Sequence, residues 1–144
     1  MSQSLIETTY TAVVEVTGGR EGHAKSSDGN LDVDLQRPAQ VGKSAAGTNP
    51  EQLFAAGYAA CLQSALLGVA SRAGHNVSKS VFTSRVSLGK AGEGTYGLGV
   101  EFDILIPGVD QVTAEELVRA AHAGCPYSNA TRGNIDVSFN VSVS

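Results

Sequence analysis

The sequence predicts one α+β domain over residues 1–144, with a mainly antiparallel sheet and a long central buried helix. Two observations lead to this fold class. Residues 52–71 carry no charge and are mostly apolar, which is typical of a helix buried in a core. Segments on both sides of this run have the residue types and alternation of strands, and few are linked by the helical crossovers of a parallel sheet. The length of 144 residues fits one compact domain.

Composition and charge exclude several classes of protein. The chain is 42% hydrophobic and 17% charged, which rules out an intrinsically disordered protein. Its 10 basic and 14 acidic residues give a net charge of −4 without any cluster of Lys and Arg, which argues against nucleic-acid binding. The N-terminus lacks the basic and apolar regions of a signal peptide, so we expect a cytoplasmic location in which thiols stay reduced.

Three strands are expected before the apolar run. Residues 7–16 alternate loosely and are rich in Val, Thr and Tyr, and the Asp-Gly-Asn sequence at 28–30 is a strong hairpin signal. Residues 31–35 then alternate strictly between apolar and acidic side chains. Arg20 lies in a glycine-rich turn between these segments, and residues 38–49 show no periodicity, so we expect a loop there.

The apolar run is predicted to be a helix that begins at Pro50. Asn49 is suited to the N-cap, Pro50 to the first helical position and Gln52 to the acceptor of a capping box, while Gly74 is suited to the end. Twenty uncharged residues are long enough to cross a bilayer. Six alanines, two glycines and several polar residues make the run weak as a membrane span, so we favour a helix inside a soluble protein and expect no membrane partner.

Two stripes of different size run along this helix and predict a homodimer. The large side chains at helical spacing are Phe54, Tyr58, Leu62, Leu66 and Val69. The small residues are Gly57, Cys61, Ala65 and Gly68. A helix that is apolar nearly all round must be covered all round, and one thin sheet covers only one side. We therefore expect a second copy of the chain to cover the other.

The rest of the chain is predicted as a hairpin, a helix and a strand. Residues 77–88 and 95–106 form the hairpin, with residues 91–94 as its turn. A capping box at 113–116 begins a second helix that stops at Gly124. Residues 135–143 alternate strictly between apolar and polar and are the clearest strand.

The residues alone leave the role of the two cysteines open. Cys61, on an apolar helix, is by default a small core residue, and burial makes a thiol less nucleophilic. It lies about three turns beyond the helix start, too far for the helix dipole to act. A reactive thiolate at this position would need a cation from elsewhere in the fold, and Arg20 is the best-placed candidate, although its default role is that of a solvated turn residue.

Cys125 follows the second helix in a loop, where chemistry is common but an incidental cysteine is common too. No C-x-x-C motif is present, and His23, His75 and His122 show no metal-ligand spacing, so we expect no metal and no cofactor. A Cys-His hydrolase with His122 near Cys125 lacks any local signature.

Two long motifs resemble those of the organic hydroperoxide resistance proteins, the Ohr branch of the Ohr/OsmC family. They are Thr48-Asn-Pro-Glu-Gln-Leu-Phe-Ala-Ala-Gly-Tyr-Ala-Ala-Cys61 and Cys125-Pro-Tyr-Ser-Asn-Ala-Thr-Arg-Gly-Asn-Ile-Asp-Val137. Residues 17–22 and 27–31 are similar to the arginine turn and the Asp-Gly hairpin of that family. The resemblance spans nearly the whole chain, with a less glycine-rich loop at residues 41–47.

This resemblance implies an OsmC-like fold, an intertwined homodimer and a thiol-dependent peroxidase. Cys61 would attack the hydroperoxide and become a sulfenic acid, and Cys125 would resolve that acid as a Cys61–Cys125 disulfide. Arg20 would hold the thiolate, and Glu51 would hold the guanidinium. The family also implies dihydrolipoamide or a lipoylated protein as the reductant.

The apolar setting of Cys61 favours organic hydroperoxides over hydrogen peroxide as substrates. The expected pocket residues are Phe54, Tyr58, Leu62 and Leu66. Glu51 and Cys61 are ten positions apart, about 15 Å along a straight helix. A shared site therefore needs either a helix break near Gly57 or residues from two subunits.

Two other functions remain open at this stage. The chain could be a non-catalytic module that binds an apolar ligand, with two incidental cysteines. It could also be a peroxide sensor, which would form the same disulfide but turn over negligibly with dihydrolipoamide.

Overall fold

The computed structural model describes residues 3–39 and 46–144, which form two compact units. The N-terminal unit spans residues 1–50 and the C-terminal unit spans residues 51–144. Each unit is described by itself. Half of the loop predicted at 38–49, and most of the less glycine-rich segment at 41–47, lies outside the described residues.

The N-terminal unit holds a small antiparallel sheet in the order β1-β2-β3. The strands are β1 (Val14–Thr17), β2 (His23–Ser26) and β3 (Asp32–Asp34), and the short 3-10 helix η1 (Gly19–Glu21) connects the first two. Thr17 is paired with His23, and His23 in turn with Asp34. The strand predicted at 7–16 is therefore confined to its C-terminal end.

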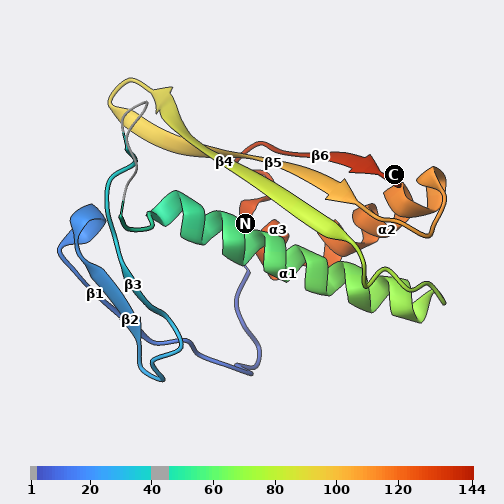
Figure 1. The fold of residues 1–144 in the computed structure, drawn as a ribbon, viewed down its shortest axis with the longest axis horizontal. Helices are drawn as coiled ribbons and strands as arrows, with labels where there is room; N and C mark the ends of the chain where they lie inside the picture. Colours follow the sequence, from blue (N-terminus) through green and yellow to red (C-terminus); the bar gives the residue numbers. More distant parts are fainter. Residues whose placement is uncertain (1–2, 40–45) are drawn as a thin grey trace. The chain divides into compact units, whose positions relative to one another are not determined.

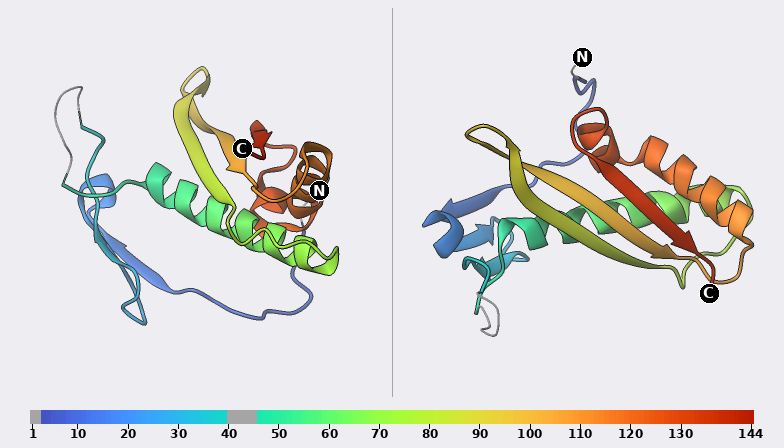
Figure 2. Two further views of the ribbon diagram at one scale, coloured as in Figure 1. Left: turned by 45° about the vertical axis from the view of Figure 1, so that its right-hand side comes forward. Right: turned by 90° about the horizontal axis from the view of Figure 1, so that it is seen from above.

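The C-terminal unit is a three-stranded sheet with helices on one face (Figures 1 and 2). Its elements are α1 (Pro50–Arg72), β4 (Val81–Gly92), β5 (Thr95–Leu105), α2 (Gln111–Gly124), α3 (Pro126–Thr131) and β6 (Val137–Ser142). Strands β4 and β5 form an antiparallel hairpin, whereas β6 pairs in parallel with β5. Within residues 3–39 and 46–144, three of the four strand pairings are antiparallel, as expected.

The core of this unit lies between the sheet and the helices. Tyr58 of α1 packs edge-to-face on Phe102 of β5, with ring centroids 4.9 Å apart, and Phe102 stacks on Phe139 of β6. Helix α2 contributes Leu117 and Val118 to the same cluster. The aromatic rings thus join α1 to strands β5 and β6.

Helix α1 buries one face and exposes the opposite one. Tyr58, Leu62, Leu66 and Ala70 of the large-residue side are fully buried. The exposed positions recur every three or four residues: Gln52, Ala56, Ala60, Ser64, Leu67 and Ser71. Among the described residues α1 is the one helix long and apolar enough to cross a membrane. The packing of its large side chains under the sheet is that of a core helix.

The α+β class and the main elements confirm the fold expected from the sequence. Helix α1 begins at Pro50, and Gly74 follows it with a positive φ of 83°. Helix α2 begins earlier than expected, because the Asp110 side chain, not Thr113, caps it and accepts from the Thr113 N–H at 2.7 Å. Helix α3, in a segment expected to be a loop, is the main addition.

Candidate active site

The two cysteine sulfurs lie together in the C-terminal unit. Cys61 is on α1, and Cys125 is at the junction of α2 and α3. Their Sγ atoms are 3.5 Å apart, and both thiols are free. Cys61 is half-buried, whereas Cys125 is fully buried. The two sulfurs therefore contact each other but differ in their access to solvent.

The chain turns sharply at Cys125, and this turn positions its sulfur. The Cys125 N–H donates to the Ala121 carbonyl at 2.9 Å and so completes α2, while the Asn129 N–H donates to the Cys125 carbonyl at 2.9 Å and begins α3. Cys125 itself is extended, with φ −73° and ψ 126°. Pro126 then occupies the first position of α3, where its missing N–H costs nothing. The cysteine is thus held between two helices at a fixed corner.

Opposing effects act on the Cys61 thiol. Burial is the largest and raises the pKa of the thiol above its ordinary value. The Tyr127 backbone amide beside the sulfur lowers this pKa, whereas the neighbouring Cys125 thiol raises it. Within these contacts, then, the neutral thiol is favoured, and a further positive group is needed for a thiolate at neutral pH.

Aromatic rings surround the helix turn that precedes Cys61. The Tyr127 ring packs on Gly57, where an added Cβ would lie 2.8 Å from the tyrosine hydroxyl oxygen. Phe54 contacts Tyr127 edge-to-face at 6.2 Å, and Tyr58 lies 5.7 Å from it. Because Gly57 and Cys61 are four residues apart, the Tyr127 ring lies on the cysteine's side of α1.

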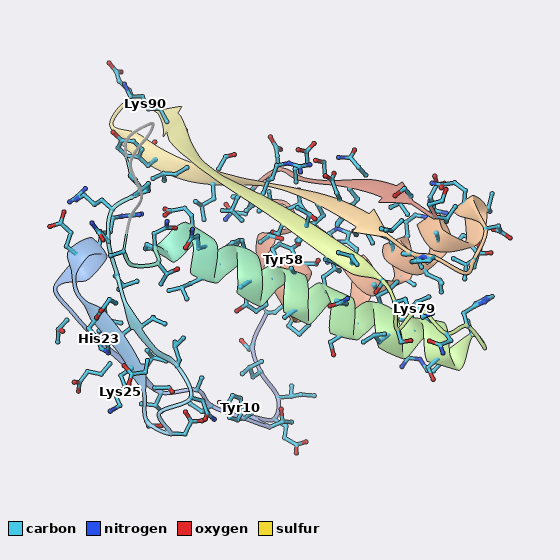
Figure 3. The ribbon with its side chains drawn as sticks, viewed as in Figure 1. Tyr10, His23, Lys25, Tyr58, Lys79 and Lys90 are labelled. Atoms are coloured by element: carbon cyan, nitrogen blue, oxygen red, sulfur yellow. The ribbon has the colours of Figure 1, made fainter. Side chains whose placement is uncertain are left out.

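A buried hydrogen-bond network joins α1 to the corner that holds Cys125. Tyr58, midway along α1 (Figure 3), places its hydroxyl 2.9 Å from Ser128 Oγ and 3.1 Å from Thr131 Oγ1. Ser128 Oγ also hydrogen-bonds with His122 Nδ1 at 2.8 Å. Burial, followed by the charge of Arg132, lowers the pKa of His122. These four residues, Tyr58, Ser128, Thr131 and His122, are called the Tyr58 network below.

The four residues expected to line the pocket differ in how far they are buried. Leu62 and Leu66 are fully buried in the core cluster, and so is the Tyr58 side chain. Phe54 is half-buried and packs against the same cluster. Of the four, Phe54 alone retains a partly accessible side chain.

Arg20 and Glu51 belong to different units. Arg20 is the middle residue of η1 and is half-buried. Its turn requires glycine, since Gly18 and Gly19 have φ values of 74° and 59° and a Cβ on Gly22 would lie 1.6 Å from the Thr17 carbonyl oxygen. Glu51 lies in the first turn of α1, which runs unbroken to Arg72. The helix break near Gly57 that could bring Glu51 to its own Cys61 is therefore absent.

Sequence reasoning missed Tyr127, Ser128 and the network role of Tyr58. A signal was present in the spacing: Tyr58 precedes Cys61 by three residues, and Ser128 follows Cys125 by three. Residues three apart on a helix are neighbours, so two contacting cysteines predict contact between these partners as well.

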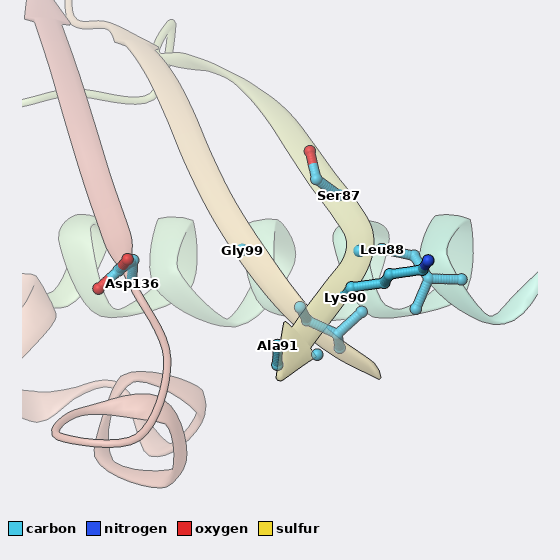
Figure 4. Close-up of a pocket in the computed structure, with 9 residues that line it drawn as sticks. Ser87, Leu88, Lys90, Ala91, Gly99 and Asp136 are labelled. Atoms are coloured by element: carbon cyan, nitrogen blue, oxygen red, sulfur yellow. The ribbon is translucent and has the colours of Figure 1, made fainter. Parts of the chain in front are cut away.

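Among the described residues, neither a metal site nor either of two hollows at the β4–β5 hairpin coincides with the cysteines. Across residues 3–39 and 46–144, no group of three His, Cys, Asp or Glu side chains is arranged to hold a metal ion. A hollow of about 310 Å³ lies at the end of the β4–β5 hairpin, beside Asp136 (Figure 4). Its lining residues are Ser87, Leu88, Gly89, Lys90, Ala91, Gly97, Leu98, Gly99 and Asp136.

Comparison with known proteins identifies the family. The model of the family described as OsmC-like protein matches residues 42–140. The chain belongs to the OsmC-like family. An organic hydroperoxide resistance protein of Xanthomonas axonopodis pv. citri is 48% identical over 134 residues, which cover 92% of this chain and 94% of that protein.

Solved structures of OsmC-like proteins agree with this assignment. The organic hydroperoxide resistance protein OhrB of Bacillus subtilis matches with a TM-score of 0.86 at 44% identity, over 93% of this chain and 99% of that one. The organic hydroperoxide resistance protein of Elizabethkingia anophelis, crystallised with thiocyanate bound, matches with a TM-score of 0.89 at 44% identity, over 96% and 100%. This OsmC-like protein is thus a member of the organic hydroperoxide resistance branch, as the sequence motifs indicated.

Proposed function

We propose that this OsmC-like protein is a thiol-dependent peroxidase that reduces organic hydroperoxides to alcohols. The observation that carries the proposal is the cysteine pair, with sulfurs 3.5 Å apart and unequal exposure. The half-buried Cys61 thiol is accessible to a substrate, whereas the buried Cys125 thiol is accessible only to Cys61. Membership of the organic hydroperoxide resistance branch supports the same substrate class.

In the first step Cys61 is the nucleophile. Its thiolate attacks the terminal oxygen of the hydroperoxide, an S–O bond forms and the O–O bond breaks. The alkoxide takes a proton and leaves as the alcohol, while Cys61 becomes a sulfenic acid. The sulfur is oxidised by two electrons, and the peroxide is reduced by the same two.

In the second step Cys125 attacks the sulfenic sulfur of Cys61. An S–S bond forms, the S–O bond breaks, and hydroxide leaves with the proton of the Cys125 thiol as water. A dithiol then reduces the disulfide by exchange through a mixed disulfide and is itself oxidised. We propose dihydrolipoamide or a lipoylated protein as this reductant, in the cytoplasm, from the family resemblance.

Activation of Cys61 is assigned to Arg20, with Glu51 orienting the guanidinium. The need for a cation follows from the burial that raises the pKa of the Cys61 thiol. An arginine is suited to this role because it stays charged and its planar fork can hold a sulfur and a carboxylate together. Since α1 is unbroken between Glu51 and Cys61, we propose that a homodimer brings Glu51 and Arg20 of one subunit to Cys61 of the other.

Mass spectrometry after one equivalent of cumene hydroperoxide tests the proposal. The wild-type chain should lose two hydrogens, and a Cys125→Ser variant should instead gain one oxygen on Cys61. Cys61→Ser should keep its mass, which serves as the control for oxidation at other residues. If the wild type and Cys125→Ser both keep their masses, the peroxidase proposal is wrong and a non-catalytic apolar-ligand module is favoured.

Turnover separates an enzyme from a peroxide sensor. A peroxidase should consume hydroperoxide continuously in the presence of dihydrolipoamide, and faster with cumene hydroperoxide than with hydrogen peroxide. Disulfide formation without turnover would identify a sensor. Equal kcat/KM values for the two peroxides would contradict the proposed substrate class.

A further inference from the structure

Two matched contacts join α1 to the corner between α2 and α3. Cys61 and Tyr58 are three residues apart on α1, and Cys125 and Ser128 are three residues apart across the first turn of α3. The Cys61 sulfur faces the Cys125 sulfur at 3.5 Å, and the Tyr58 hydroxyl faces Ser128 Oγ at 2.9 Å. The tyrosine–serine hydrogen bond therefore lies about one helical turn from the sulfur pair, between the same two segments.

The corner that carries Cys125 is braced internally by its own hydrogen bonds. His122 of α2 hydrogen-bonds with Ser128 of α3, and Arg132 Nη2, just past α3, donates to the His122 carbonyl at 2.6 Å. Thr131 Oγ1 donates to the Ser128 carbonyl at 3.3 Å. Loss of the Tyr58 hydroxyl would leave all of these bonds in place. It would remove the hydrogen bonds that Ser128 and Thr131 of the corner make with Tyr58 of α1.

Helix α3 depends on contacts with neighbouring elements to stay in position. It has six residues, too few for a helix to be stable without tertiary contacts. The Tyr58 ring packs edge-to-face on Phe102 at 4.9 Å and on Phe54 at 6.0 Å, in addition to its contact with the Tyr127 ring of α3 at 5.7 Å. The ring that carries the hydroxyl is therefore packed into the core. Ser128 and Thr131 of the corner hydrogen-bond to this hydroxyl.

We infer that the Tyr58 hydroxyl is a positioning group that holds the Cys125 thiol against Cys61 and thereby sets the rate of disulfide formation. This inference rests on the proposed peroxidase function and adds a residue that acts on the second step alone. The Cys61 sulfenic acid has two fates: attack by Cys125, which releases water, or reaction with a second hydroperoxide, which adds an oxygen and gives a sulfinic acid. The closer Cys125 is held, the smaller the share of protein lost to sulfinic acid.

The test is a single-turnover comparison of the wild type with Tyr58→Phe, which keeps the ring. We expect the rate at which Cys61 consumes the first equivalent of cumene hydroperoxide to stay unchanged. The rate of disulfide formation should fall by about tenfold or more, since a displacement of ~1 Å can slow a reaction up to about a hundredfold. Excess hydroperoxide should then yield more protein carrying two added oxygens than it does with the wild type.

Three further variants separate positioning from general loosening. Ser128→Ala removes the other end of the Tyr58–Ser128 bond, so it should slow disulfide formation too. Because the two single variants share that bond, the double variant should be slowed by less than the two single effects combined. Tyr96→Phe makes the same chemical change on β5, where Tyr96 is 70% exposed, and should behave as wild type. Ile104→Val removes a methyl group from the core of β5 and should lower the thermal midpoint without changing the rate of disulfide formation.

The outcomes distinguish this inference from the proposed function. A wild-type chain that forms no disulfide overturns the peroxidase proposal itself. A wild type that forms the disulfide, with Tyr58→Phe at the same rate, overturns the inference and leaves the peroxidase intact. Equal slowing of both steps in Tyr58→Phe, or a slowed second step in Ile104→Val, also overturns it, because either result indicates a general structural effect.

Discussion

At Cys61 one environment serves two opposing requirements. An apolar setting favours the proposed organic substrate, but the same burial raises the pKa of the thiol that we propose as the nucleophile. The Tyr127 backbone N–H offsets part of that effect and adds no net charge to the setting. A guanidinium that approaches from elsewhere, as we propose for Arg20, resolves the conflict, because it supplies charge at one point and leaves the aromatic rings in place.

Histidine protonation provides a prediction at single-residue scale in the N-terminal unit. His23 Nδ1 lies 2.7 Å from Asp34 Oδ1 and Nε2 lies 2.5 Å from Asp32 Oδ1, and these hydrogen bonds raise the pKa of His23 above 6.5. The stability gained from them should be fully present below pH 6.5, the ordinary value, and be lost as the pH rises through the raised pKa.

The measurement is an NMR titration together with denaturant unfolding at several pH values. The pKa of His23 should lie above 6.5 and that of His122, which is lowered by burial, below it in the same spectra. His23→Gln should lose more stability at pH 6 than at pH 9. A His23 resonance that titrates below pH 6.5, or a loss of stability in His23→Gln that does not depend on pH, would contradict the proposed interaction of protonated His23 with Asp32 and Asp34.

The cysteine pair shows what could and could not be predicted at residue scale. Neither residue reveals its partner locally, because 64 positions separate them and no C-x-x-C motif is present. The family motifs provided the pairing. The family motifs assigned no network role to Tyr58, Ser128, Thr131 or His122. Each of these residues, taken alone, is typical of an ordinary helix or loop position.

At the scale of elements, helix α1 was predictable and helix α3 was not. Twenty uncharged residues between a capping sequence and Gly74 give a long, strong signal. Six residues that begin at Pro126 give no helical period, and the fold of α3 depends on the surrounding helices. The parallel pairing of β6 with β5 was equally unpredictable, since alternation predicts a strand but not the strand with which it pairs.

Two glycines of α1 provide a prediction at this scale. An added Cβ on Gly68 would lie 3.5 Å from Arg72 Nη1, an ordinary contact, whereas one on Gly57 would lie 2.8 Å from the Tyr127 hydroxyl. Gly68→Ala should therefore raise the free energy of unfolding by about 0.5–1 kcal/mol, the usual gain from alanine in a helix. Gly57→Ala should gain less or lose stability, because the Tyr127 ring must move.

Urea unfolding followed by circular dichroism measures both variants, with Gly68→Ala as the matched control. A double variant, Gly57→Ala with Tyr127→Ala, removes the clash and should recover part of the helix gain relative to Tyr127→Ala alone. Equal stabilisation by the two single substitutions would show that the Tyr127 ring does not rest on Gly57 in solution.

At the scale of the whole molecule, surfaces in both units support the proposed homodimer. The exposed face of α1 carries Ala56, Ala60 and Leu67 and no charged side chain between Gln52 and Ser71. In the N-terminal unit Tyr10, Val14 and Val16 are exposed. An uncharged helix face and an apolar strand open to water are costly in a monomer and are suited to burial against a second copy.

The proposed division of the active site between two subunits makes a sharp prediction for mixed dimers. Cys61→Ser and Glu51→Gln should each inactivate their own homodimer. In a heterodimer of the two variants, the Cys61 of the Glu51→Gln chain would meet the intact Glu51 of the other chain, so one of the two sites would be complete. Co-expression with two different affinity tags, followed by sequential purification, yields this heterodimer. Its turnover with cumene hydroperoxide and dihydrolipoamide should be about half that of the wild type.

The control is a chain that carries both substitutions, paired with a wild-type chain. One of its two sites lacks Cys61 and the other lacks Glu51, so this heterodimer should be inactive. If each site used residues of a single chain, the result would be reversed, with an inactive first heterodimer and a half-active control.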